Sequence, residues 1–383
     1  MSSALLTGTA PALHLGSGRV RLQKVPIVQK KRQSRTRVNV QDVADKAGVS
    51  VATVSRAFNL PDVVSDDVRE RVLATAKRLG YSPNAAARAL RSRKTHIVGA
   101  VIPSLDYAIY AKMVNAFQKS FSQHGYMTIV LTTGFDNRDI FDQVKLLVER
   151  GAEALVFVGA IEDPALRKFL REATLPAVTT YSHLPNEIVP SIGFDNAKAV
   201  EATVDHLADL GHKEFALVSS IADGNDRQRA RIEGYQIALR RLKLSGADRI
   251  FAHPYSIEDG AAAMHEIYEA CPQVTAIVCT SDVHGFGVLS ECRRMGLRVP
   301  QDVSVTGFDD AEYAARLEPA LTTTFVPADE MGVAAAAALH RALTKGQKPS
   351  WVRLDTKLIV RESSGSPGKA QDLVSARRAA IRR

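Results

Sequence analysis

The stretch 38–59, VNVQDVADKAGVSVATVSRAFN, decides the N-terminal part of the fold, because a helical pattern stops inside it and restarts at once. Asn39 is a favoured N-cap, and the apolar residues behind it recur at the spacing of one helical face. Gly48 supplies the left-handed conformation that ends a helix, and Val49 is expected to fill the gap between the helices. Ser50 then caps a second helix. The pattern predicts a helix-turn-helix, whose second helix can lie in a DNA major groove.

The second helix has two contrasting faces. Val51, Val54 and Phe58 share one apolar face, which is expected to pack on the first helix. The other side carries short, polar or cationic side chains, which leave room for close approach to base edges. The residues of this motif that we expect to contact DNA are Ser50, Val51, Ala52, Thr53, Ser55, Arg56 and Asn59.

A third helix is predicted over 66–80, DDVRERVLATAKRLG, with Ser65 as its N-cap and Gly80 as its C-cap. Acidic residues lie at its N-terminus, where their negative charge interacts favourably with the positive end of the helix dipole. Its inward face is formed by Val68, Val72, Ala76 and Leu79. The three helices are expected to close a small domain over 38–82.

The following segment, 83–96, is predicted to be a hinge helix and linker. Its good helix formers run from Asn84 to Arg91, yet Leu90 is its one large apolar side chain before the body begins. Such a helix is marginal alone, so we expect it to form against a twin helix and DNA. Leu90 suits a wedge between base steps of the minor groove, and Arg88 is a second candidate DNA contact. Without the preceding domain, a flexible linker would be the preferred interpretation.

Charge is distributed unevenly along the chain, whose formal net charge is +9. Residues 1–41 carry eight Lys or Arg and no acid, whereas 97–366 carry a net charge of −7. A basic end on an acidic body favours binding of a polyanion by the end alone. Residues 1–37 are interpreted as a disordered basic segment, and 365–383 as a basic, solubilising C-terminal tail.

From residue 97 the hydrophobic period changes. Short, nearly continuous apolar runs such as HIVGAVIP alternate with helical stretches up to VSVTGFD at 303–309. This alternation predicts parallel sheets covered by helices on both faces. There are more strand–helix units than one small sheet can hold. Residues 97–364 are therefore predicted to form two Rossmann-like lobes with a cleft between them.

The chain resembles the LacI/GalR family of transcriptional regulators in three features. These are the helix-turn-helix, the segment RVLATAKRLGYSPNAAARALRSRKTHIVGAVIP and the closing stretch LDTKLIVRESS. The resemblance runs from Val38 to Ser364. It implies a periplasmic-binding-protein-like body, whose chain crosses between lobes three times. We expect these crossings near Asp195, Pro300 and Val326. The resemblance also implies a homodimer that binds a palindromic operator in double-stranded DNA and a small-molecule effector.

Candidate effector residues lie where strands end, since ligands of open parallel sheets bind there. Arg231, Tyr255 and Asp282 each follow a predicted strand. An aspartate facing an arginine can clamp hydroxyls or a carboxylate, and an aromatic ring can stack on a sugar. The resemblance implies the same three positions and adds Tyr110. The alternatives are a helix cap for Asp282 and a surface charge for Arg231. Four further residues are interpreted as structural: Asp195, Asn196, Asp309 and Asp310.

The identity of the effector is less constrained. Three stretches are similar to those of gluconate-type members of the family: AIVCTSD, ECRRMGLRVPQD and IGFDN. A sugar or sugar acid is therefore favoured, and purine, pentose and hexose ligands remain open.

Other function classes lack their motifs. There is no phosphate-binding loop, no GxSxG elbow and no CxxC pair among the three Cys, so no enzyme activity, cofactor or metal is expected. No apolar run reaches the ~20 residues of a membrane helix, and no secretory signal is seen, so a cytoplasmic protein is expected. A solute-binding protein would need that signal and no helix-turn-helix. A sugar-processing α/β enzyme would need a phosphate loop or a catalytic base. The sequence thus favours a DNA-binding repressor controlled by a metabolite.

Overall fold

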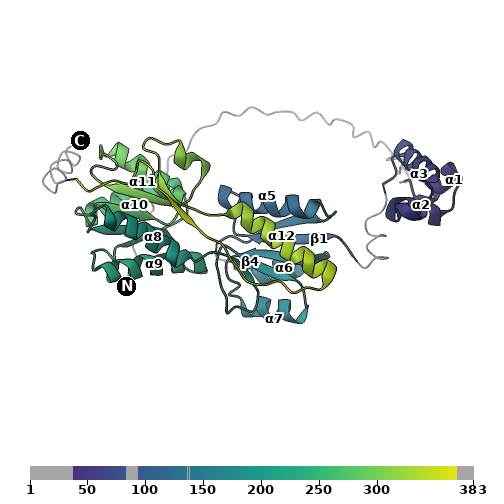
Figure 1. Ribbon diagram of the computed structural model, residues 1–383, viewed down its shortest axis with the longest axis horizontal. Helices are drawn as coiled ribbons and strands as arrows, with labels where there is room; N and C mark the ends of the chain where they lie inside the picture. Colours follow the sequence, from purple (N-terminus) through teal and green to yellow (C-terminus); the bar gives the residue numbers. More distant parts are fainter. Residues whose placement is uncertain (1–37, 83–93, 136, 138, 369–383) are drawn as a thin grey trace, which may run out of the picture. The chain divides into compact units, whose positions relative to one another are not determined.

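The computed structural model describes residues 38–82, 94–135, 137 and 139–368 (Figure 1). The chain divides into two compact units, 1–84 and 85–383. The first unit is helical and the second contains two sheets flanked by helices. Among the residues that the structure describes, no helix is both long enough and apolar enough to cross a membrane.

Over 38–82, the part of the first unit that the structure describes, there are three α-helices and a short 3-10 turn. Their bounds are α1 (Val40–Ala47), α2 (Val51–Asn59), the turn η1 (Pro61–Val63) and α3 (Asp66–Leu79). All three helices pack on one apolar core, whose fully buried members are Val43, Ala44, Ala47, Val54, Ala57, Val72 and Ala76.

Local signals set the break between α1 and α2 as predicted. The Asn39 side chain accepts hydrogen bonds from the backbone of Gln41 and Asp42, and the Asp42 carboxylate accepts from the Asn39 N–H, which completes a capping box. Gly48 ends α1 in the left-handed conformation, with φ 67° and ψ 38°. The Ser50 hydroxyl then accepts from the Thr53 N–H at 3.1 Å and starts α2. Ser65 stands at the N-cap of α3 as expected, but its hydroxyl makes no capping bond.

The second unit has two lobes. The lobe that contains the first strand, called the N-lobe, has a six-stranded parallel sheet in the order β11-β5-β4-β3-β1-β2. Its strands are β1 (Ile97–Ile102), β2 (Met127–Thr132), β3 (Ala152–Val158), β4 (Ala177–Thr180), β5 (Ser191–Gly193) and β11 (Val352–Arg353). Its helices are α5 (Ala108–Ser122), α6 (Ile140–Glu149), α7 (Pro164–Glu172) and α12 (Ala328–Lys345).

The second lobe, called the C-lobe, contains a six-stranded sheet in the order β12-β10-β9-β8-β6-β7, with only β12 antiparallel to its neighbour. Its strands are β6 (Phe215–Ser220), β7 (Ile250–His253), β8 (Ala276–Cys279), β9 (Ser304–Asp309), β10 (Thr322–Phe325) and β12 (Lys357–Ile359). Its helices are α8 (Asn196–Asp209), α9 (Asp226–Leu242), α10 (Ile257–Ala270) and α11 (Asp282–Arg294), with the 3-10 turn η2 (Glu312–Ala315) after β9.

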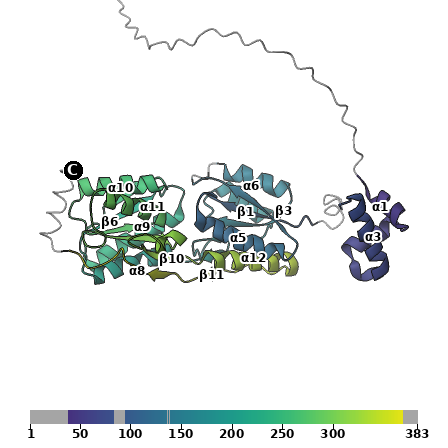
Figure 2. The same ribbon diagram turned by 90° about the horizontal axis from the view of Figure 1, so that it is seen from above.

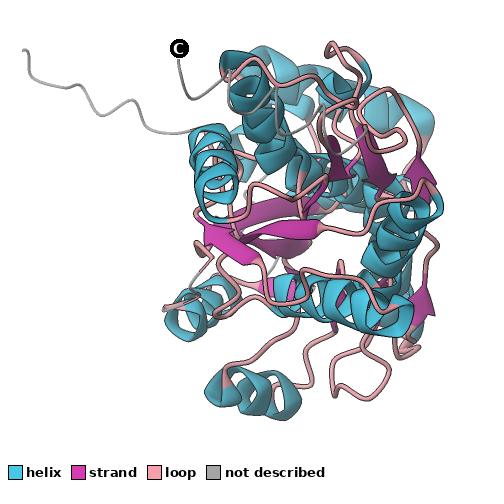
Figure 3. Ribbon diagram, turned by 90° about the vertical axis from the view of Figure 1, so that its left-hand side faces the viewer, coloured by secondary structure: helices cyan, strands magenta, loops and turns pink. Residues whose placement is uncertain are grey.

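Helices cover both faces of each sheet, which explains the continuous apolar strands (Figures 2 and 3). In the C-lobe, one face of β6 packs on α8 and α9 and the other on α10 and α11. In the N-lobe, α5 and α12 lie on one face of the sheet, while α6 and α7 lie on the other. Every residue of β6 and of β9 is buried.

The chain passes between the lobes three times, but one predicted crossing is wrong. The first follows β5 at Phe194 and Asp195, and the second precedes α12 at Val326. Both match the expectation. Pro300, however, lies between α11 and β9, which both belong to the C-lobe. The third crossing is at 354–356, because the last apolar stretch divides into β11, which pairs with β5, and β12, which pairs with β10.

The C-lobe holds the chain slightly beyond the predicted boundary at Ser364. The Gly365 N–H donates to the Ser304 hydroxyl at 3.1 Å, and its carbonyl lies 2.8 Å from Nε2 of the buried His212. The other ring nitrogen of His212 contacts the Thr275 hydroxyl at 2.9 Å. Burial lowers the pKa of His212, so the neutral ring is favoured at this anchor.

Candidate functional site

The outer side of α2 is open to solvent. Ala52, Arg56 and Asn59 are exposed, and Thr53 and Ser55 are half-buried. Val51 differs from them, since its side chain packs partly against the apolar core of the unit. Apart from Val51, the candidate DNA-contacting residues of this helix thus share one surface, with Arg56 as the cation of its last turn.

Several of these polar side chains have partners within the helix. The Ser50 hydroxyl lies 2.9 Å from that of Thr53 in addition to capping α2. Asn59 Nδ2 donates to the Ser55 carbonyl at 2.8 Å, so Asn59 closes the last turn. The proposed contacts of these residues with DNA stay predictions. Arg88 and Leu90 lie outside the described residues.

Arg231 is the charged centre of the C-lobe candidate site. It lies on α9, is 5% exposed, and donates from Nε to Asn196 Oδ1 at 2.8 Å and from Nη1 to the Thr280 carbonyl at 2.6 Å. Its guanidinium carbon stands 3.7 Å from the ring centroid of Phe308. The surface-charge alternative for Arg231 is therefore wrong. Asn196, interpreted from sequence as structural, holds the guanidinium in place.

Asp282 has both carboxylate oxygens engaged inside the C-lobe. Oδ1 accepts from the Thr323 hydroxyl at 2.5 Å, and Oδ2 accepts from the Ala311 N–H at 2.6 Å. Burial raises the pKa of this carboxyl well above its usual range. These contacts tie β10 and the loop after β9 to the start of α11. The helix-cap alternative for Asp282 is wrong, because Ser281 is the N-cap of α11 and accepts from the His284 N–H at 3.2 Å. The effector role of Asp282 stays a prediction.

Asp309, at the end of β9, is the acid whose charge acts most strongly on Arg231. Its Oδ2 accepts a hydrogen bond from the Tyr255 hydroxyl at 3.3 Å. Burial raises its pKa to about 6, while the positive charge of Arg231 acts in the opposite direction. The structure thus brings together Arg231, Tyr255 and Asp309. Sequence reasoning set Asp309 aside as structural, although it lies at the carboxyl end of a strand, where the other candidates were sought.

Aromatic rings from both lobes surround this polar group. Tyr107 of the N-lobe and Tyr255 of the C-lobe meet edge to face with centroids 4.1 Å apart, and the Tyr107 hydroxyl donates to the Tyr255 carbonyl at 2.5 Å. Tyr110 is buried and meets Tyr181 edge to face at 5.4 Å. Phe135 stacks on Tyr255 at 5.9 Å. Rings of this kind offer apolar faces with polar rims.

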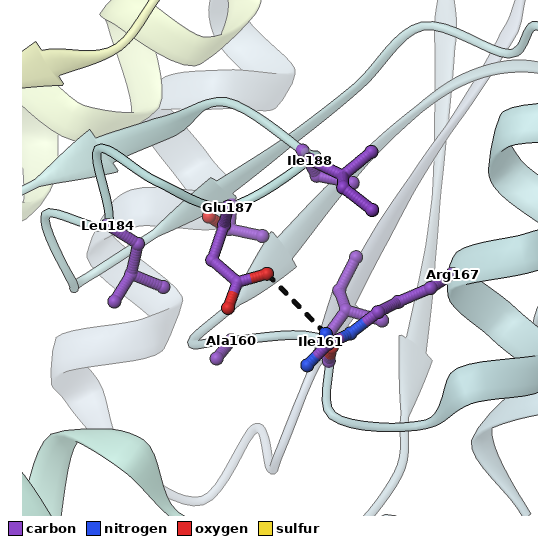
Figure 4. A pocket seen from close by; sticks show the side chains of 8 residues that line it. Ala160, Ile161, Arg167, Leu184, Glu187 and Ile188 are labelled. Carbon is purple, nitrogen blue, oxygen red and sulfur yellow. Dashed lines mark hydrogen bonds and ion pairs between the residues drawn. The ribbon is translucent and has the colours of Figure 1, made fainter.

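A small cavity lies in the N-lobe beside the end of β3 (Figure 4). Its volume of about 10 Å³ is suited to roughly one water molecule and is too small for a sugar. Arg167 and Glu187 lie across it with an N–O distance of 3.7 Å. The lining residues are Ala160, Ile161, Arg167, Thr179, Leu184, Glu187, Ile188 and Val189.

Known proteins match along both units. Residues 39–84 match the lacI family of bacterial regulatory proteins, and 204–364 match a periplasmic binding protein-like domain. Catabolite control protein A of Priestia megaterium is 30% identical over 332 residues, which cover 85% of this chain and 99% of that protein. The chain belongs to the LacI family.

Two further LacI-family relatives support the same conclusion. The transcriptional repressor PurR of Escherichia coli O139:H28 is 30% identical over 338 residues, covering 85% of this chain and 96% of PurR. A structure of the lac repressor dimer bound to operator and the anti-inducer ONPF has a TM-score of 0.78 and 26% identity, covering 86% and 99% of the two chains. The present chain is a DNA-binding transcriptional regulator of the LacI family. The resemblance to gluconate-type members stays a prediction.

In the parts of the chain that the structure describes, no cluster of three or more His, Cys, Asp or Glu could hold a metal ion.

Proposed function

We propose that this chain is a repressor, that it binds a palindromic operator as a homodimer, and that a sugar or sugar acid between its lobes controls this binding. The observation that carries the DNA part is the α1–Gly48–α2 motif with its exposed outer surface. PurR is itself named a repressor, and the lac repressor structure holds a dimer on operator, which supports the proposal.

Base reading is assigned to the outer surface of α2. Ala52 and the exposed part of Val51 offer methyl groups that fit thymine methyls but cannot make bidentate hydrogen bonds. Arg56, one turn further along α2, carries the donors that suit the O6 and N7 atoms of guanine. We infer that Arg56 supplies the hydrogen-bonded base contact of each half-site.

This inference is tested by selecting preferred sites from random DNA and then titrating Arg56→Ala. We expect a loss of about 1–3 kcal/mol and relaxed preference at one base pair per half-site. Arg78→Ala, which removes an exposed cation in the last turn of α3, is the matched control and should leave base preference unchanged. An equal loss for Arg56→Ala on every sequence would make Arg56 a phosphate contact instead.

The effector is placed beside Arg231, Asp309 and the rings of Tyr107, Tyr110 and Tyr255. The arginine and the carboxyl can hold hydroxyl or carboxylate groups, and the rings can cover the apolar face of a sugar. The full chain should be screened by thermal shift against sugars, sugar acids and nucleobases, since a ligand at 100 times its Kd adds about 2.7 kcal/mol.

Asp282→Ala separates the two roles considered for that residue. Loss of the ligand response with intact operator binding would support an effector contact. Normal ligand binding by the variant would leave Asp282 as an anchor of the loop after β9, in line with its hydrogen bonds to Thr323 and Ala311.

Dimerisation is assigned to large apolar residues of the C-lobe whose side chains are exposed, namely Ile221, Ile257, Tyr313 and Leu317. Tyr313 lies in η2 and is 71% exposed. Tyr313→Asp should shift the molar mass in light scattering toward a monomer. Val333→Asp, at an exposed position on α12, is the control and should leave the mass unchanged.

A further inference from the structure

The first turns of α9 make contacts that reach from the C-lobe into the N-lobe. Asp226 and Arg227 open this helix, and Arg229 follows them. They meet the loop 159–162, which follows β3, and Ser182, which follows β4.

Asp226 makes the central contact. Its Oδ1 accepts from the Ala160 N–H at 3.1 Å, and its Oδ2 accepts from the Ser182 hydroxyl at 2.5 Å. The neighbouring Arg227 donates from Nη1 to the same Oδ1 at 2.8 Å. The Asp226 side chain is 13% exposed and that of Arg227 is 7% exposed. Hydrogen bonds to an ionised, sheltered carboxylate are about twice as strong as neutral ones.

Gly159 provides the space for this approach. A Cβ atom at Gly159 would lie 1.6 Å from Arg227 Nη1 and 2.6 Å from Asp226 Oδ1. The φ angle of Gly159 is +79°, which other residues rarely adopt. A larger residue at this position would displace the Arg227 and Asp226 side chains from their present contacts, so Gly159 suits the docking of α9.

The receiving loop is itself held in place. Asp163 caps α7 by accepting from the Leu166 N–H at 2.6 Å, and Arg167 Nε donates to the Ile161 carbonyl. Arg167 also faces Glu187 across the small cavity (Figure 4). Ala160 thus presents its N–H from a fixed backbone, so little ordering is needed when Asp226 docks.

We propose that Asp226, supported by Arg227, is a latch that holds the two lobes closed. The Arg229–Glu162 pair adds little, because both side chains are more than 40% exposed and exposed ion pairs contribute weakly. Arg231 lies on the same helix, so release of the latch moves the charged centre of the candidate effector site together with α9. Release and uptake of the effector then require the latch to open. This last step rests on the proposed function.

Hydrogen exchange of the full chain, followed by mass spectrometry, tests the latch without effector or DNA. In Asp226→Ala, the amide of Ala160 loses its acceptor, and peptides covering 158–163 should exchange at least about tenfold faster. Ser182→Ala, which removes one of the two contacts, should give a smaller acceleration. Asp223→Ala removes an exposed carboxylate from the same loop before α9 and should change nothing. Unchanged exchange of β6 would show that the C-lobe stays folded.

Distance measurement separates lobe opening from a local loss of protection. Spin labels at Leu146→Cys on α6 and Ile237→Cys on α9 occupy exposed positions in the two lobes, with Cys271→Ser as background and excess unlabelled chain to dilute labelled pairs. Asp226→Ala should add longer distances that Asp223→Ala lacks. If both Asp226→Ala and Ser182→Ala show the same hydrogen exchange and the same spin-label distances as the wild type, the proposal is wrong. If Asp226→Ala does not fold, Ser182→Ala decides the question. Because neither measurement uses effector or DNA, failure of the latch leaves the proposed repressor function intact.

Discussion

Replacing Asp309 by asparagine should stabilise the protein at neutral and alkaline pH. Burial raises the pKa of Asp309 from the ordinary 3.8 to about 6, even with Arg231 and Tyr255 beside it. The folded state therefore prefers the protonated carboxyl, which asparagine imitates in shape and charge. The difference of about 2 pKa units corresponds to roughly 3 kcal/mol at ~1.36 kcal/mol per unit.

The pH dependence follows from the direction of this change. A carboxyl whose folded pKa is raised stabilises the fold below pH 3.8, and this stabilisation is lost as pH rises through about 6. Wild type and Asp309→Asn should therefore unfold alike below about pH 4, diverge between pH 4 and 6, and differ by a nearly constant amount above pH 6. At pH 8 the variant should be more stable by up to about 3 kcal/mol, or several degrees in Tm for a body of this size.

Thermal unfolding at half-unit steps between pH 4 and 8 measures this difference, with Asp248→Asn as a control at an exposed position of the same lobe. The control should follow wild type at every pH. A constant offset between wild type and Asp309→Asn over this whole pH range, or a less stable variant at pH 8, would refute the reasoning. Either result would mean that the attraction between Arg231 and the charged Asp309 carboxylate outweighs the cost of burying that charge.

Three further changes have defined outcomes. Asn39→Ala removes the cap of α1 and should cost about 1 kcal/mol in unfolding of the helix-turn-helix unit, followed by circular dichroism. Gly234→Ala would place a Cβ 2.2 Å from the Ala197 carbonyl oxygen where α8 and α9 meet, and should cost about 1–3 kcal/mol in thermal unfolding. Leu90→Ala, predicted from sequence alone, should weaken binding to selected operator DNA more than to random DNA in parallel titrations. Equal losses on both DNAs would make the segment a passive tether.

The helix-turn-helix could be predicted almost completely from sequence, because local residues determine it. Asn39, Gly48 and Ser50 each perform the capping role that their chemistry indicates. The alternating strands and helices of the body were equally readable, since both faces of each sheet are buried. Such signals depend on neighbours in the chain and need no knowledge of distant contacts.

What could not be predicted depends on contacts between distant segments. The crossing expected at Pro300 was wrong because the stretch around 352–359 looks like one strand, although it pairs with two different sheets. The environment of Asp309 was missed because Arg231 and Tyr255 reach it only in the folded C-lobe. The hydrogen bonds that occupy Asp282 come from Ala311 and Thr323, and no local pattern around Asp282 indicates them.

The position of β11 and α12 in the chain has a consequence for synthesis on the ribosome. Both elements complete the N-lobe, β11 as an edge strand beside β5 and α12 as the helix packed on α5, yet both follow almost the whole C-lobe in sequence. A nascent chain that ends before Ala328 leaves α5 and the sheet beneath it uncovered. The C-lobe, by contrast, needs only β12 to finish. We expect the lobe translated first to stay incomplete until residue 353 has emerged, only a few residues before β12 completes the C-lobe, so that newly made chains depend on chaperones up to that point.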